Sequence, residues 1–129
     1  MYANLQNAPV AQVGSKDSIV IVDNFQSIRG GATLDVTGFT PTVIEAGHVI
    51  IKETANGNLK PMPVSGSAYA ALPASHTYAG IVIASIATAK PFAGVLVRGT
   101  INPVAAPYDF ATIAAAVKTA LPLIDQRAD

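Results

Sequence analysis

The sequence predicts a mainly β domain with one short helix near its C-terminus. Two apolar runs rich in β-branched residues, 81–86 and 95–101, are bounded by glycine and proline, which is typical of buried strands. The loop between them, around Lys90 and Pro91, is too short for a helical crossover, so the two runs should pair antiparallel. The predicted fold class is therefore a small antiparallel β-barrel or sandwich-like domain with an extended N-terminal arm.

The composition limits the classes of function. The chain has 129 residues, of which 50% are hydrophobic and 12% charged, so it can form one folded domain with a core of its own. Eight basic and eight acidic residues give a net charge of zero, which argues against binding to nucleic acid or to anionic membranes. Cysteine is absent, which excludes disulfides and thiolate metal sites.

The chain shows no targeting or membrane signal. No apolar stretch approaches the ~20 residues needed to span a bilayer. Residues 1–7 lack the basic and apolar regions of a signal peptide, so we expect a protein that is made in the cytoplasm and stays soluble.

The N-terminal residues 1–17 differ in composition from the rest and are predicted to form an extended arm before a β-rich domain at 18–129. The arm is polar and rich in alanine, but it carries Leu5, Val10 and Val13 as possible anchors. Two interpretations stay open: a frayed terminus, or an arm that orders only when it docks on a partner.

Turn residues divide the β domain into short strands. Asn56 and Gly57 form the strongest short hairpin signal in the chain. Pro61 restricts the returning segment to an edge strand or an extended ribbon, and residues 65–76 are predicted to form a surface loop. Besides the two runs above, strands are predicted at 18–23, 33–37, 43–44, 49–51 and 59–61.

The C-terminal region changes to a helical period. Asp109 is a natural N-cap, and Pro122 should end the helix near Ala120. One helical face would carry Phe110, Ile113, Ala114, Val117 and Leu121.

The sequence contains no recognisable catalytic, metal or cofactor site. His48 and His76 are the only histidines, and their spacing from nearby carboxylates matches no ligand pattern, so we expect loop histidines without a ligand role. The Gly30–Gly31 pair lacks the strand–glycine–helix context of a phosphate loop. No nucleophile with an oriented base is apparent, so an enzyme and a bound cofactor are not expected.

Arg98 is the charged residue that stands out, because it interrupts the apolar run 95–101. It is either a solvated residue at a sheet edge or one partner of an ion pair with another subunit or a capsid.

Several segments together resemble the head decoration (auxiliary capsid, or head fiber) proteins of tailed phages. The resemblance covers roughly residues 29–121 and depends on the order of short strand-and-turn motifs, none of which is specific alone. The motifs are RGGATLDVTGFT at 29–40, AGHVII at 46–51, NLKP at 58–61, AGIV at 79–82 and VLVRGTIN at 95–102.

The resemblance implies a small β-barrel or sandwich-like domain that forms homotrimers on the exterior of the virion. Its partner would be the major capsid protein of an expanded icosahedral head, which such trimers stabilise without a cofactor. Leu5, Val10, Val13 and Arg98 are the candidate capsid or subunit contacts.

Three other functions remain open. A fiber, spike or baseplate component would differ by its place on the particle. A host-surface or carbohydrate-binding β module should display clustered aromatic residues, whereas aromatic residues make up only 6% of this chain. An enzyme would need the catalytic groups that the sequence does not display.

Overall fold

The computed structural model describes residues 17–127, and its fold is mainly β, as predicted. A six-stranded sheet forms the centre of the molecule, with the strand order β1-β11-β8-β4-β5 and with β12 beside β11. The strands are β1 (Ile21–Ser27), β4 (Val49–Glu53), β5 (Leu59–Pro61), β8 (His76–Val82), β11 (Val95–Ile101) and β12 (Ile124–Gln126). Within the described residues this path is open at β1 and β5, so the sandwich-like alternative describes the fold better than a closed barrel.

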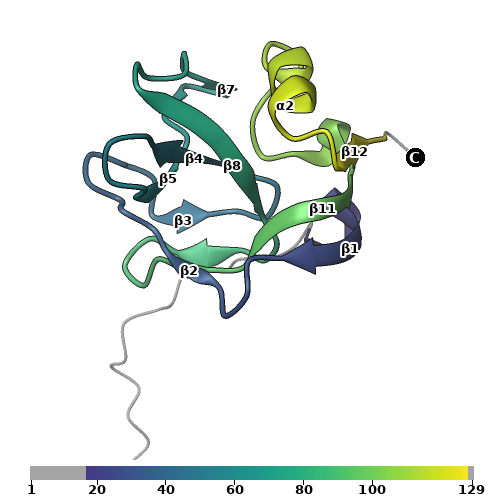
Figure 1. The fold of residues 1–129 in the computed structure, drawn as a ribbon, viewed down its shortest axis with the longest axis horizontal. Helices are drawn as coiled ribbons and strands as arrows, with labels where there is room; N and C mark the ends of the chain where they lie inside the picture. The colour runs from purple at the N-terminus through teal and green to yellow at the C-terminus, as the bar shows by residue number, and fades with distance from the viewer. Residues whose placement is uncertain (1–16, 128–129) are drawn as a thin grey trace, which may run out of the picture.

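Small sheets and short helices surround the main sheet (Figure 1). The two-stranded sheets are β2 (Ala32–Thr33) with β10 (Phe92–Ala93), β3 (Val43–Ile44) with β9 (Ile86–Ala87), and β6 (Val64–Ser65) with β7 (Ala68–Tyr69). The helical elements are α1 (Asp17–Val20), the 3-10 helix η1 (Pro103–Ala105) and α2 (Ala114–Ala120). In Figure 1, α2 lies at the same end of the molecule as β12.

The central strands of the main sheet bury side chains on both faces because side chains alternate along a strand. In β4, Val49 and Ile51 enter one hydrophobic cluster, together with Phe110 and Val117 from the C-terminal region. Ile50 enters a second cluster, built with residues of the small sheets β2–β10 and β3–β9. All three β4 side chains are almost fully buried, so the fold has a core on each side of the sheet.

Two local predictions are confirmed. The chain reverses direction at Asn56 and Gly57, and β5 pairs antiparallel with β4 as an outer strand. The predicted helical face is also correct, because Phe110, Ile113 and Val117 are buried. The helix itself begins at Ala114 rather than at Asp109, since the Asp109 carboxylate accepts a hydrogen bond from the Ala111 amide in a preceding turn.

The predicted strand at 18–23 is wrong in its first half. Residues 17–20 form the helical turn α1, and the strand begins only at Ile21. The cause is tertiary: the Asp17 carboxylate accepts hydrogen bonds from the Ser85 amide at 2.9 Å and from the Ser85 hydroxyl at 2.6 Å. Val20 is buried, and its carbonyl accepts a hydrogen bond from the Asn102 amide.

The run 81–86 is divided rather than continuous. Its first part ends β8 at Val82, and Ile86 begins β9, which pairs with β3. The expected pairing with β11 is antiparallel but covers only two residue pairs. The bend between the two parts places Ser85 beside Asp17, a contact between residues far apart in the sequence.

Three further predictions need correction. The strand at 33–37 shortens to β2, because the Asp35 carboxylate accepts from the amide and hydroxyl of Thr37 and forms a turn. The predicted loop at 65–76 contains the small hairpin β6–β7 and the start of β8. β12 was not predicted, and it pairs parallel with β11, so the main sheet is not wholly antiparallel.

Candidate interaction surface

Strand β1 forms an exposed edge of the main sheet. It pairs antiparallel with β11 on one side and has no strand partner on the other among residues 17–127. Every β1 residue after Ile21 is exposed, including the apolar Val22 at 47% and Phe25 at 67%. Large apolar side chains at a sheet edge mark a surface that a partner can cover.

Arg98 contributes to the same surface. Its strand lies between β1 and β8, so the residue is not at a sheet edge, contrary to one of its two predicted interpretations. The side chain is nevertheless exposed, and its guanidinium carbon lies 5.9 Å from the centroid of the Phe25 ring. At this distance the cation and the ring attract each other, so Arg98 and Phe25 form a pair on the surface. No carboxylate of the described chain forms a salt bridge with Arg98.

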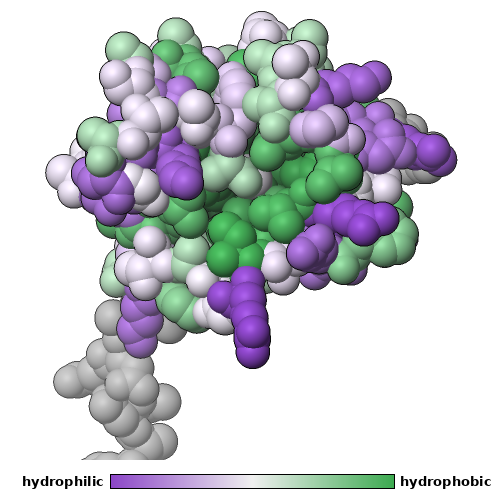
Figure 2. Space-filling view, in the orientation of Figure 1, coloured by the Kyte–Doolittle hydropathy of each residue, from purple (hydrophilic) through white to green (hydrophobic). Residues whose placement is uncertain are grey.

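Apolar side chains also gather elsewhere on the surface. Figure 2 shows hydrophobic residues across the middle of one face, over the region where β8 and β11 meet. Outside β1, the exposed large apolar residues are Ile19, Phe92, Val104 and Leu123. None of these positions is recognisable as exposed from the sequence, because an apolar residue in a β-rich chain is ordinarily assigned to the core.

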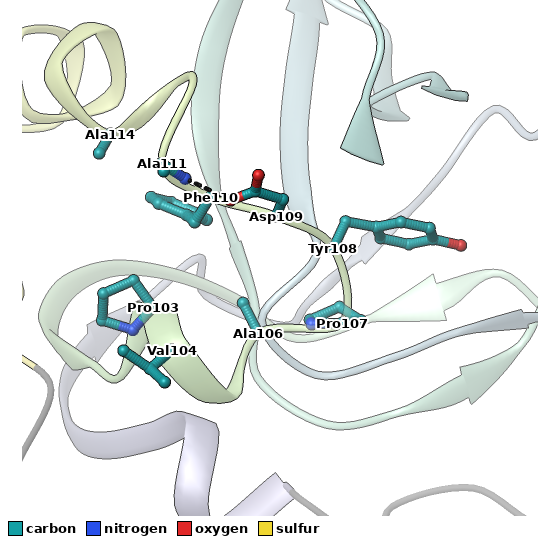
Figure 3. A pocket seen from close by; sticks show the side chains of 9 residues that line it. All are labelled: Pro103, Val104, Ala106, Pro107, Tyr108, Asp109, Phe110, Ala111 and Ala114. Atoms are coloured by element: carbon teal, nitrogen blue, oxygen red, sulfur yellow. Dashed lines mark hydrogen bonds between the residues drawn. The ribbon is translucent and has the colours of Figure 1, made fainter. Parts of the chain in front are cut away.

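A groove of 510 Å³ lies between η1 and the start of α2 (Figure 3). Pro103, Val104 and Ala106 lie on one side, with Phe110 and Ala111 across from them. Its full lining is Pro103, Val104, Ala106, Pro107, Tyr108, Asp109, Phe110, Ala111 and Ala114, and we call it the 103–114 groove. Asp109 is the one charged residue in this lining, so the groove suits an apolar occupant.

His48 lies in the loop between β3 and β4, as expected, but its side chain is buried in the core. Its ring contacts the rings of Phe39, Tyr69 and Tyr108, with centroids 5.3–5.4 Å apart. Nε2 donates a hydrogen bond to the Met62 carbonyl at 2.9 Å, and Nδ1 has no partner among the described residues. Burial lowers the pKa of His48 to about 4, so the imidazole is neutral at pH 7.

A cluster of three charges lies on the opposite edge of the sheet. The Lys60 ammonium lies 3.4 Å from a Glu53 carboxylate oxygen and 4.0 Å from one of Asp35. Hydrogen bonds from Thr37 lower the pKa of Asp35, and a bond with Asn56 lowers that of Glu53. Each group is paired or hydrogen-bonded and half-buried, which is typical of structural ion pairs.

Leu5, Val10 and Val13, the predicted arm contacts, lie outside the described residues. Across residues 17–127, no three His, Cys, Asp or Glu side chains converge into a possible metal site. The described helices are also too short or too polar to span a bilayer.

Comparisons with known proteins give no relative. No protein-family model, no curated protein and no solved structure matches the chain.

Proposed function

We propose that this protein is a structural component of a tailed-phage virion that binds the outer surface of the capsid and stabilises the expanded head. It acts by covering surface and not by catalysis, and its partners are the major capsid protein and further copies of itself. The order of motifs in residues 29–121 is the sequence argument for this proposal. The exposed β1 edge, with Val22 and Phe25, is the structural observation that supports it best.

The β1 surface has the properties that binding of this kind requires. A specific interface needs an apolar centre with a polar border, and aromatic and arginine side chains contribute most strongly to such centres. Phe25 and Arg98 provide this pair on one surface. Exposed polar residues of β1, Asp23, Asn24 and Gln26, surround it.

Many copies of the same contact would bind the capsid tightly even if each single contact is weak. A capsid presents many identical sites, and an oligomer of this chain would engage several of them together without needing new contacts. We therefore propose a homotrimer as the unit that binds. Light scattering on a sizing column measures the mass of the purified protein. If the protein has the mass of a monomer at about the concentration used for imaging, the homotrimer is contradicted.

Electron cryomicroscopy of particles from the encoding phage tests the location. Particles assembled with the protein should carry added density on the outside of the head, and particles assembled without it should lack that density. The head without the protein should also rupture at a lower temperature. Density on the tail, a fiber or the baseplate would overturn the proposal in favour of the alternative structural roles.

A pair of matched variants tests the surface. Phe25→Asp should reduce occupancy on the head, because it places a charge in the centre of the β1 surface. Phe92→Asp is the control, since Phe92 is similarly exposed at 61% but belongs to the separate β2–β10 sheet. Equal occupancy of both variants would contradict the assignment to β1.

A further inference from the structure

The 103–114 groove lies directly against the point where the N-terminal segment joins the domain. The Asn102 amide, at the start of η1, donates a hydrogen bond to the Val20 carbonyl of α1 at 2.8 Å. On the other side, Gly47 lies between Val20 and Pro107, and a β-carbon at Gly47 would collide with Val20. One wall of the groove, from Pro103 to Pro107, is therefore packed on the element to which residues 1–16 are attached.

We propose that residues 1–16 of the same chain bind in the 103–114 groove, with Val10 and Val13 as the side chains that fill it. This inference concerns the protein in solution and does not depend on a capsid. It assigns an occupant to the apolar 103–114 groove, which no other part of residues 17–127 fills.

The composition of the segment matches the groove. Lys16 is the one charged side chain in residues 1–16, whereas Leu5, Val10 and Val13 are apolar and Pro9 restricts the backbone. The groove is lined by proline, alanine, aromatic residues and Val104, which is 79% exposed. Binding would remove apolar surface of the segment and of the groove from water. Few charged groups would lose their contact with solvent.

The length of the segment is also sufficient. Val13 lies four positions before Asp17, and an extended chain spans roughly 14 Å over that separation. Val10 lies seven positions before Asp17, a separation that spans up to roughly 25 Å. Because Asp17 is fixed by Ser85, the segment is held at a high effective concentration beside the groove. This tether favours the same chain over a second copy as the occupant.

The absence of cysteine allows a direct test in the full chain. A nitroxide spin label on Gln12→Cys would be the only label in the protein. We expect the backbone amide signals of Ala106, Ala111 and Ala114 to lose most of their intensity in the nuclear magnetic resonance spectrum. The amide of Gly57, in the β4–β5 turn, should keep its intensity.

Two variants identify the contact. Val104→Asp should restore the Ala106 and Ala111 signals, and the fold should tolerate it because Val104 is exposed. Val13→Asp should have the same effect from the side of the segment. Phe92→Asp, an equally polar change elsewhere on the surface, should leave the signal loss unchanged.

Three results would overturn the inference. The first is unchanged intensity of the groove signals in the labelled protein. The second is signal loss that persists in both Val104→Asp and Val13→Asp. The third is signal loss in isotope-labelled protein mixed with spin-labelled protein of natural isotope content, because it would assign the groove to the segment of a neighbouring copy.

Discussion

Acid should destabilise this protein through His48, a buried histidine that has no acceptor for a second proton. Its Nε2 proton is already used in the hydrogen bond to the Met62 carbonyl. A proton on Nδ1 would therefore introduce a charge among the rings of Phe39, Tyr69 and Tyr108. The Tyr69 and Tyr108 phenols are neutral at acid pH, and burial raises their pKa values further, so neither supplies a negative charge to a protonated His48.

The size of the effect follows from the two pKa values of His48. The pKa is 6.5 for an unperturbed histidine and about 4 in the folded protein. Because the unfolded chain binds the proton more readily, acid favours unfolding. The difference corresponds to about 3 kcal/mol, present in full above pH 6.5, lost as the pH falls from 6.5 to 4, and constant below that. Such a loss is a large part of the ~5–15 kcal/mol that stabilises a typical domain.

Urea unfolding between pH 7 and pH 4 measures this dependence. Carboxylates with lowered pKa values, such as Asp35 and Glu53, also lose stabilising charge in acid, so a comparison of variants is needed. His48→Phe should be less stable at pH 7, because the Met62 carbonyl loses its donor, but its free energy of unfolding should fall less between pH 7 and pH 4. His76→Gln is the control, since it removes the other, half-buried histidine. Equal falls in the wild type and in His48→Phe would refute the reasoning.

Three further substitutions test the fold, each by thermal or urea unfolding. Gly47→Ala should cost about 2 kcal/mol or more, because φ is +90° there and the added carbon would collide with Val20; a neutral effect would contradict the close packing of α1. Asp17→Ala should cost about 2 kcal/mol, since both hydrogen bonds from Ser85 end on its carboxylate, and a Ser85→Ala background should remove only part of that cost, because the Ser85 amide still donates to Asp17. Lys60→Met should change stability by less than about 1 kcal/mol, because its carboxylate partners lie at 3.4 and 4.0 Å and all three side chains remain partly open to solvent, and a larger loss would indicate a coupled network.

The parts of the fold that depend on local sequence could be predicted. The turn at Asn56 and Gly57 and the strands on either side of it follow from turn chemistry and β-branched residues. The buried face with Phe110, Ile113 and Val117 follows from the helical period. In each case the residues that determine the structure lie within a few positions of one another.

The parts that depend on distant contacts could not be predicted. The α1 turn is held by a contact between Asp17 and Ser85, which are 68 positions apart. β12 pairs with β11 only because α2 brings the chain back to it. An apolar run such as 18–23 has the same appearance in the sequence whether its strand lies inside a sheet or at its edge.

The same limit applies to the candidate surfaces. Arg98 was recognised because a charge within an apolar run is a visible local anomaly. Phe25 and Val22 were missed, since their exposure results from the position of β1 at the end of the sheet. Pro103 and Pro107 received no role from the sequence, although both line the groove.

The geometry of β1 also limits how a partner can cover it. Its pairing with β11 contains three register irregularities, between Ile21 and Asp23, between Asn24 and Gln26, and between Gln26 and Ser27. An added strand needs evenly spaced amide and carbonyl groups along the free edge, and bulges interrupt this spacing. A partner that extends the sheet would therefore form only a few of the hydrogen bonds available to a regular strand. Contact through Phe25, Val22 and Arg98 does not depend on that spacing, so side-chain packing is the mode of binding that this edge favours.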